Sequence, residues 1–376
     1  MILPGQTLGL LGGGQLGRMF TQAAQRMGYE VIVLDPDPGS PAGRIALDHI
    51  QAPYTDEGAL ERLGRASAAV TTEFENVPAD ALAFLERFCP VRPGPRAVSL
   101  TQDRITEKTF ARAQGLGTAD FHPVLAPGDA AAAFAAIGAP AILKTARLGY
   151  DGKGQATVHA AAEVEAAFER FGRRACILER RVDLALEVSV VLARGADGNL
   201  VTFPVAENRH VDGILDTSVV PARAPQATLD AARAAAATLA TAMDYVGTMA
   251  VEFFVTTGGA LLVNEMAPRP HNSGHYTLDA CATDQFEQQV RALAGLPLGD
   301  TALLAPATMV NLLGDLWHDG VPRWERALHD PRVHLHLYGK TEARPGRKMG
   351  HITVLAADPA AALDAALAAR RRLTER

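Results

Sequence analysis

The sequence predicts a mixed α/β and α+β fold, in which a parallel α/β domain precedes a two-lobed α+β unit and a small third domain. Residues 7–35 have the pattern of a strand, a glycine turn, a helix and a second strand. Later segments mix strands with alanine-rich helices, and the tail has short strands around a basic turn. A length of 376 residues suits two to three such domains.

The first segment contains a glycine turn that is typical of anion binding. Residues 8–11 form a short buried strand, and apolar residues then recur at helical spacing until Gly28, which suits a helix end. Between them, Gly12-x-Gly14-x-x-Gly17 has the spacing of a dinucleotide-binding turn, and Asp35 follows Gly17 by 18 residues, as an NAD ribose would require. The motif alone is weak, because a strand, a glycine turn and a helix N-terminus bind any anion.

The second and third units are predicted element by element. Thr101 or Asp103 caps a helix that glycines at 115–117 end. The later elements are expected to be helix 127–140, strand 141–146, helix 161–172, strands 175–182 and 186–193, helix 228–244 and hairpin 248–268. We expect domains at 1–104, 105–296 and 297–376.

The hairpin places two carboxylates opposite each other. If Gly258 and Gly259 form a two-residue turn, the numbers of paired residues sum to 517, and Glu252 faces Glu265. Like charges so placed destabilise a hairpin unless a cation lies between them or one is protonated. Hard oxygen ligands suit Mg²⁺, and Asn264 adds another oxygen. A longer turn would shift the register and separate the carboxylates, and the hairpin alone leaves both interpretations open.

A glycine-rich loop at 149–155 surrounds Lys153, with Lys144 on the strand before it. Glycine lets backbone amides approach phosphates, and lysines supply positive charge. No Ser or Thr follows the lysine, so this is not a Walker loop. Taken alone, the loop is more typical of a plain flexible hairpin connection than of a phosphate site.

Two further polar clusters follow the hairpin. The loop 265–277 is broken by proline and glycine and presents polar side chains for ligand recognition, although its histidines, taken singly, suit structural roles equally well. These side chains are Arg269, His271, Asn272, Ser273 and His275. In the tail, a Pro345-Gly346 turn would spread the basic residues around a phosphate monoester, unless they form an ordinary solvated turn. The basic residues are Lys340, Arg344, Arg347 and Lys348.

Composition excludes several classes of protein. The net charge of −6 gives no sign of general nucleic-acid binding. Cys89, Cys176 and Cys281 form no CxxC pair, so we expect buried free thiols in a reducing cytosol. The N-terminus lacks a basic leader, and no stretch has the roughly 20 apolar residues of a membrane helix.

The combination of features favours a ligase that uses ATP. A hydride-transfer enzyme needs neither a second phosphate loop nor a pair of metal carboxylates. The segments LLGGGQLGRM, LGYDGKGQ, AENRHVDGIL, NEMAPRPHNSGHYT and RPGRKMGH, in this order, resemble the ATP-grasp superfamily and, within it, the N5-carboxyaminoimidazole ribonucleotide synthetase family. The resemblance covers almost the whole chain, and PRPHNSGHYT and RPGRKMGH are its most specific parts.

The resemblance implies an ATP-grasp fold with a Rossmann-like preATP domain and a small C-terminal domain. It implies carboxylation of the amine of 5-aminoimidazole ribonucleotide by ATP and bicarbonate through carboxyphosphate, with Mg²⁺ or Mn²⁺ as the metal. It also implies a cytoplasmic homodimer with small-molecule substrates and neither nucleic-acid nor membrane partners.

The resemblance also implies functions for individual residues. The implied catalytic residues are Lys144, Glu252, Glu265 and Arg269, with Glu252 and Glu265 as metal ligands. The implied ATP contacts are Arg104, Lys144, Gly149, Tyr150, Asp151, Gly152, Lys153, Gly154, Gln155, Glu179, Arg180, Arg181, Val182, Glu187, His210, Asn264 and Glu265. The implied ribonucleotide contacts are Gly14, Gln15, Leu16, Glu73, Glu75, Asn76, His271, Asn272, Ser273, Lys340, Arg347 and Lys348.

One position departs from the family pattern. Arg180 and Arg181 stand where an acidic or amide residue followed by an apolar one is expected, which matters if side chains recognise the adenine.

Three alternative functions stay open. They are a formate-using glycinamide ribonucleotide transformylase, a nicotinamide-dependent oxidoreductase and a non-catalytic nucleotide-binding protein.

Overall fold

A computed structural model describes residues 1–149 and 154–375. The first sheet is parallel and orders its strands β3-β2-β1-β4. Its strands are β1 (Thr7–Leu11), β2 (Glu30–Leu34), β3 (Asp48–Ile50) and β4 (Ala69–Thr72), and the helices of this segment are α1 (Gln15–Arg26), α2 (Glu57–Ala66), α3 (Ala79–Leu85) and α4 (Pro95–Thr101). These elements confirm the predicted parallel α/β segment, and Gly28 ends the turn after α1 at φ +82°.

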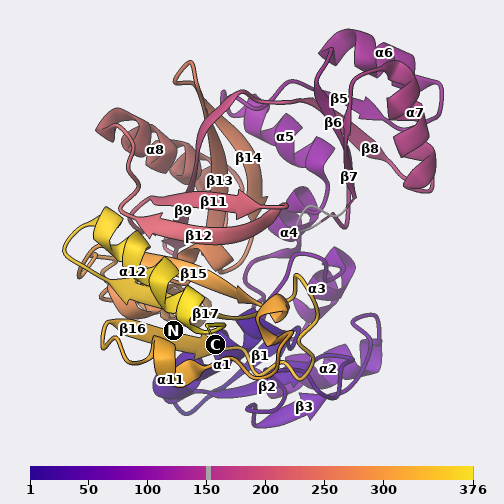
Figure 1. The fold of residues 1–376 in the computed structure, drawn as a ribbon. Coiled ribbons are helices and arrows are strands. Elements are labelled where there is room, and N and C mark those ends of the chain that lie inside the picture. Colours follow the sequence, from indigo (N-terminus) through magenta and orange to yellow (C-terminus); the bar gives the residue numbers. More distant parts are fainter. Residues whose placement is uncertain (150–153, 376) are drawn as a thin grey trace.

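The second sheet is small, antiparallel and separate from the first (Figure 1). Its order is β5-β8-β6-β7, and α6 and α7 pack on it through a core of small and aliphatic side chains. Its elements are β5 (Phe121–Val124), α6 (Asp129–Ile137), β6 (Ala141–Thr145), β7 (Gln155–Val158), α7 (Ala161–Arg170) and β8 (Cys176–Arg180). Helix α5 (Arg104–Ala113) leads into it, and Asp103, the second of the two predicted caps, accepts hydrogen bonds from Ile105 N and Thr106 N.

The third sheet is the largest and extends through the C-terminal segment. Its order is β14-β13-β9-β11-β12-β15-β17-β16, with β10 paired to β9. The strands are β9 (Leu184–Arg194), β10 (Leu200–Thr202), β11 (Ala206–Val211), β12 (Ile214–Val220), β13 (Gly247–Thr256), β14 (Leu261–Ala267), β15 (Ala307–Leu313), β16 (Val333–Leu337) and β17 (Lys348–Leu355). The C-terminal strands therefore belong to the same sheet as β9–β14, because β15 pairs with β12.

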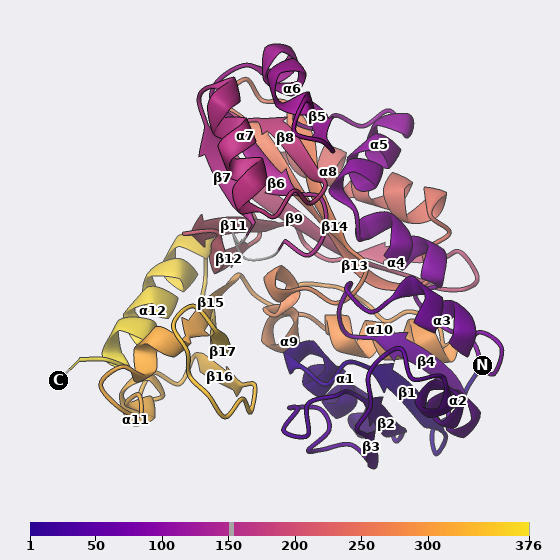
Figure 2. The same ribbon diagram turned by 90° about the vertical axis from the view of Figure 1, so that its right-hand side faces the viewer.

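The remaining helices pack around this sheet and join it to the first one. They are α8 (Gln226–Ala242), α9 (Thr277–Ala280), α10 (Gln285–Ala294), α11 (Trp324–Ala327) and α12 (Pro359–Arg372), with 3₁₀ turns η1 (Asn272–Gly274) and η2 (Gly314–Trp317). Phe286, Val290 and Leu293 of α10 share a core with β1 and α1. Figure 2 shows the first sheet below, the β5–β8 sheet above and the C-terminal strands to one side. In the described residues, no helix combines the length and apolar character that crossing a membrane requires.

The β13–β14 hairpin reaches the predicted pairing by a different route. Glu252 pairs with Glu265, as predicted, but the two-residue turn is wrong, since residues 257–260 separate the strands. Nearer the turn the register differs by one, because Phe253 pairs with Val263. Asn264 is the extra residue of the resulting bulge, and this bulge restores the pairing of the two carboxylates.

Candidate active site

The glycine turn is closed by the chain's own carboxylates. Glu73 accepts hydrogen bonds from Gly14 N at 2.7 Å and Gly17 N at 2.8 Å, while Asp35 accepts from Gly13 N at 2.7 Å. Burial raises the pKa of Glu73, and the two amides oppose that rise. The anion at the N-terminus of α1 is therefore Glu73 itself, which occupies amides that a dinucleotide pyrophosphate would need.

The carboxylates of Glu252 and Glu265 lie side by side on adjacent strands. Burial, followed by repulsion from Glu265, raises the pKa of Glu252 to about 7. Burial also acts on Glu265, but the guanidinium of Arg104, whose Nη1 donates to Glu265 Oε2 at 2.9 Å, outweighs it and lowers that pKa. Two like charges are thus held together with one cation beside them, as expected for a site that receives a further cation.

The oxygen atoms at this position fit Mg²⁺. Asn264 Oδ1 is buried and has no hydrogen-bond partner, and Asn264 directly precedes Glu265 in β14, so its oxygen is a candidate further ligand. In the described part of the chain, no cluster of three or more His, Cys, Asp or Glu side chains is arranged to hold a metal. A pair of carboxylates suits Mg²⁺, which binds one or two carboxylates together with water and substrate phosphates.

A buried ion network lies next to the metal carboxylates. Lys144 Nζ donates to Glu179 Oε2 at 2.7 Å, and Lys108 Nζ lies 3.3 Å from Glu179 Oε1. Lys108 also donates to the carbonyl of Asn264 at 3.0 Å, although its side chain is only 1% exposed. Burial raises the pKa of Glu179, but the two lysines outweigh burial and lower it to about 2. The network therefore links the strand that carries Lys144 to the strand that carries the metal carboxylates.

The glycine loop is described only at its ends. Arg104 Nη2 donates to the carbonyl of Gly149 at 3.3 Å, so the loop begins beside the Arg104–Glu265 pair. Gly154 has φ +72°, and its carbonyl accepts from Thr145 N at 2.8 Å, while Gln155 pairs with Lys144 across β6 and β7. The predicted ATP contacts Tyr150, Asp151, Gly152 and Lys153 lie outside the described residues.

The nucleotide contacts predicted between residues 179 and 210 lie on β8, directly after it, on β9 and on β11. His210 Nδ1 and Glu187 Oε2 are in hydrogen-bond contact between β11 and β9. The side chain of Arg180 is exposed and pairs with Asp120 at 3.3 Å, and Arg181 is also exposed. Val182 follows them at the end of β8. At the position that departs from the family pattern, the Arg180 side chain therefore pairs with Asp120.

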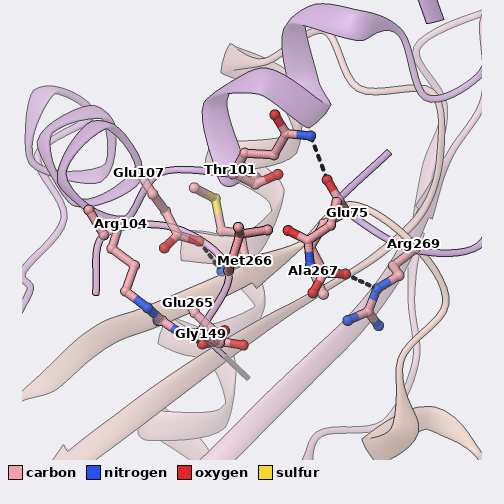
Figure 3. A pocket seen from close by; sticks show the side chains of 13 residues that line it. Glu75, Thr101, Arg104, Glu107, Gly149, Glu265, Met266, Ala267 and Arg269 are labelled. Atoms are coloured by element: carbon pink, nitrogen blue, oxygen red, sulfur yellow. Dashed lines mark hydrogen bonds and ion pairs between the residues drawn. The ribbon is translucent and has the colours of Figure 1, made fainter. Parts of the chain in front are cut away.

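A pocket lies between the first domain and β14, the strand that carries Glu265. It encloses about 40 Å³, roughly three times the space that one water needs. Figure 3 shows Arg104 beside Glu265 on one side, and on the other Arg269, whose Nε donates to Glu75 Oε2. Burial acts on Glu75, but Arg269 outweighs it and lowers the pKa. Asn76 also lines the pocket, which is polar and contains two arginines together with the carboxyl groups of Glu75, Glu107 and Glu265.

The predicted ribonucleotide contacts divide into accessible and buried groups. Lys340 Nζ donates to Gln15 Oε1 at 2.6 Å and to the carbonyl of Lys348 at 2.7 Å, so the basic tail meets the start of α1. Arg347 lies on the same turn and donates to the carbonyl of Glu342 at 2.9 Å. The side chain of Leu16 instead packs in the core of the first domain.

Buried hydrogen bonds hold the loop that follows β14. The side-chain amides of Asn272 and Asn311 pair at 2.7 and 3.0 Å, and Ser273 is fully buried. His271 is turned the other way, with Nε2 3.6 Å from Glu252 Oε1. Burial, followed by the positive charge of Arg269, lowers the pKa of His271 well below its usual value. The loop therefore presents an imidazole of lowered pKa next to the carboxylate of Glu252.

Sequence reasoning missed two residues of the ion network, Glu107 and Lys108. Glu107 is buried, and its Oε1 accepts a hydrogen bond from Met266 N. Burial, followed by the Glu265 charge, raises its pKa to about 8. Lys108 lies four positions after Arg104 on α5 and therefore on the same helix face, which is the signal that could have found it.

Comparison with known proteins identifies the family of the chain. Residues 5–102 match a ribonucleotide synthetase preATP-grasp domain model, 109–286 an ATP-grasp domain model and 307–365 a phosphoribosylaminoimidazole carboxylase C-terminal domain model. The chain is 49% identical to the N5-carboxyaminoimidazole ribonucleotide synthase of Brucella melitensis over 352 residues, which cover 93% of this chain and 96% of that one.

Solved structures are similar over nearly the full length. One is an ADP complex of an N5-carboxyaminoimidazole ribonucleotide synthetase, with a TM-score of 0.92, 44% identity and coverage of 98% of this chain and 97% of that one. Another is the Aspergillus clavatus N5-carboxyaminoimidazole synthase with ADP and 5-aminoimidazole ribonucleotide, with a TM-score of 0.89, 29% identity and 98% coverage of both chains. The chain therefore belongs to the N5-carboxyaminoimidazole ribonucleotide synthase family of ATP-grasp ligases.

Proposed function

We propose that this protein uses ATP and bicarbonate to carboxylate the amine of 5-aminoimidazole ribonucleotide in purine biosynthesis. The observation that carries the proposal is the paired Glu252 and Glu265 with the unpartnered oxygen of Asn264, beside Arg104 and Lys144. This arrangement suits a metal–triphosphate complex. The Brucella relative has this activity in its name, and the Aspergillus structure holds ADP together with the aminoimidazole substrate.

The reaction proceeds in three balanced steps. A bicarbonate oxygen attacks the γ-phosphorus of ATP, the bond to the bridging oxygen breaks, and ADP leaves with that electron pair. The carboxyphosphate then breaks its carbon–oxygen bond and releases CO₂ and phosphate. Finally the substrate amine attacks the carbon of CO₂, forms a nitrogen–carbon bond and gives one proton to the released phosphate.

The residues act by positioning and by neutralising charge. Arg104 and Lys144 face the triphosphate, where they balance the charge that develops on the leaving oxygens. The pocket between Arg104 and Arg269 receives bicarbonate, because it is small and polar and contains two guanidinium groups beside its carboxyl groups. Bound Mg²⁺, or Mn²⁺ in its place, would neutralise phosphate charge at Glu252 and Glu265.

The substrate phosphate is assigned to the basic tail. Lys340, Arg347 and Lys348 lie where the tail meets the start of α1, so the ribonucleotide spans the first domain and the C-terminal strands. Glu73 and Glu75 face this region from the first domain. The remaining assignments of ATP and ribonucleotide contacts given above form part of the same proposal.

The test is ADP formation measured with and without the aminoimidazole ribonucleotide, in buffer with bicarbonate and in buffer depleted of it. Full turnover should require all three substrates. Turnover with formate would indicate the transformylase instead. NADH fluorescence quenching without ATP would indicate an oxidoreductase, and ADP binding without turnover a non-catalytic protein.

We further propose a cytoplasmic homodimer with domains at 1–104, 105–296 and 297–376. The three cysteines are free and buried, as is usual in a reducing compartment. The dimer and the domain boundaries rest on the family resemblance. Sedimentation equilibrium tests the dimer, and limited proteolysis tests the boundaries.

A further inference from the structure

A continuous chain of buried hydrogen bonds runs from the large sheet to His271. Ser218 Oγ donates to Asn208 Oδ1, Asn208 Nδ2 donates to Ser189 Oγ, and Ser189 Oγ donates to Ser273 Oγ, each at 2.8 Å. Ser273 Oγ lies 2.9 Å from His271 Nδ1. The four residues that lead to His271 are Ser218, Asn208, Ser189 and Ser273. They are at most 6% exposed and come from β12, β11, β9 and η1, respectively. We call this set the serine–asparagine chain.

The direction of each hydrogen bond follows from the number of protons available. Asn208 gives an amide proton to Ser189, so the single hydroxyl proton of Ser189 is directed to Ser273. Ser273 Oγ accepts that proton and can direct its own proton to His271 Nδ1, 2.9 Å away. In this arrangement Nδ1 is an acceptor without a proton.

A second contact leads to the same conclusion independently. The backbone N–H of Ser273 donates to His271 Nδ1 at 3.3 Å, and a backbone N–H cannot accept. A proton on Nδ1 would be directed at this N–H. The ring therefore carries its proton on the opposite nitrogen, Nε2, which faces Glu252 Oε1 at 3.6 Å.

We propose that the serine–asparagine chain holds His271 in the tautomer that carries its proton on Nε2 and donates a hydrogen bond from this nitrogen into the reaction centre. Ser273, Ser189 and Asn208 are positioning residues, and they act through His271. The donor is directed at an anionic oxygen in that centre, the carboxylate of bicarbonate or carboxyphosphate being the chemistry it suits. His271 does not remove the amine proton, because Nε2 already carries one.

Only the identity of the acceptor rests on the proposed function, and the tautomer can be measured without turnover. The full chain is labelled with ¹⁵N-histidine, and a long-range ¹H–¹⁵N correlation spectrum distinguishes protonated from unprotonated ring nitrogens. The His271→Gln variant assigns the signals of His271 by their loss. We expect an unprotonated Nδ1 and a protonated Nε2. A protonated Nδ1 would overturn the proposal even if the enzyme turns over as expected.

A pair of substitutions then separates a hydrogen-bond donor from a base. Gln at position 271 keeps an amide donor without basicity, whereas Met keeps only volume. A donor function predicts a kcat loss of about 10-fold in His271→Gln and 100-fold or more in His271→Met. Equal losses of 100-fold or more in both variants would indicate a general base instead. If neither variant loses kcat, His271 has no function in the reaction.

The positioning function is tested with two matched serine substitutions. Ser189→Ala interrupts the chain in its middle, so the second tautomer of His271 should appear in the spectrum and kcat should fall several-fold. Ser218→Ala removes only the first hydroxyl and leaves the direction of the later bonds unchanged, so the spectrum should stay that of the parent. Identical histidine spectra in the parent and Ser189→Ala would refute the positioning function.

Discussion

The buried carboxylate of Glu179 should stabilise the folded protein strongly and in a pH-dependent way. Glu179 is 2% exposed and lies between Lys144 and Lys108, which lower its pKa from an ordinary value of 4.5 to about 2 against the opposing effect of burial. Glu179→Gln removes the anion and leaves Lys108 buried without its ion partner. We expect this change to destabilise the protein without altering its fold.

The magnitude follows from the two pKa values. The interval from 4.5 to about 2, at about 1.36 kcal/mol per pH unit, corresponds to about 3.4 kcal/mol at pH 7. Removing one partner of a buried ion pair typically costs about 3–5 kcal/mol, which agrees. Because the folded pKa is depressed, this stabilisation is present above pH 4.5 and lost as the pH falls towards 2. At pH 4 it should be about 2.6 kcal/mol.

The assay is urea unfolding of the full chain followed by circular dichroism at pH 7 and pH 4. The control is Glu165→Gln, an exposed carboxylate on α7 of the same lobe, which should change stability by less than about 0.5 kcal/mol. The stability difference between parent and Glu179→Gln should narrow by about 0.8 kcal/mol from pH 7 to pH 4. Equal stability at pH 7, or a difference that widens at pH 4, would refute the reasoning.

Three further substitutions test other parts of the site. Glu265→Gln should lower kcat by 100-fold or more while circular dichroism stays unchanged, because a metal ligand and the partner of Arg104 are both lost; activity near that of the parent would remove the metal assignment. Arg347→Ala should raise the KM for the ribonucleotide about 10-fold and leave the KM for ATP unchanged, since one phosphate contact is lost; equal effects on both KM values would contradict this placement. Gly14→Ala should lower the unfolding temperature in calorimetry by several degrees, because its Cβ would lie 2.3 Å from Glu73 Oε1, whereas Gly128→Ala, with open space around its Cβ, should change it little; similar shifts in both would argue against the Glu73 contact.

The sequence predicted local features well where the chain itself sets the geometry. The strand–turn–helix segment at 7–35 and the cap at Asp103 follow from periodicity and side-chain hydrogen bonding, and both are confirmed. The pairing of Glu252 with Glu265 is also confirmed. The predicted two-residue turn was wrong, but a bulge at Asn264 shifts the register by one residue and restores this pairing. Counting along a hairpin cannot foresee a bulge, because packing on the rest of the sheet decides where the extra residue lies.

Long-range contacts could not be predicted from local patterns. The closure of the glycine turn by Glu73 joins residues 56 to 59 positions apart, and the Glu75–Arg269 pair joins residues 194 apart. The hydrogen bonds behind His271 are of the same kind, since Ser189 and Ser273 lie 84 positions apart. Each depends on how sheets dock on one another, which periodicity does not report.

The continuation of the large sheet into the C-terminal strands has a consequence for synthesis on the ribosome. Until β15 (Ala307–Leu313) emerges, the outer side of β12 has exposed amides and carbonyls with no strand to bind. A nascent chain that ends before residue 307 therefore exposes an unpaired strand edge that is prone to aggregation. The middle of the protein can reach its final state only when most of the chain has been translated, and premature termination should yield aggregates rather than a smaller functional enzyme.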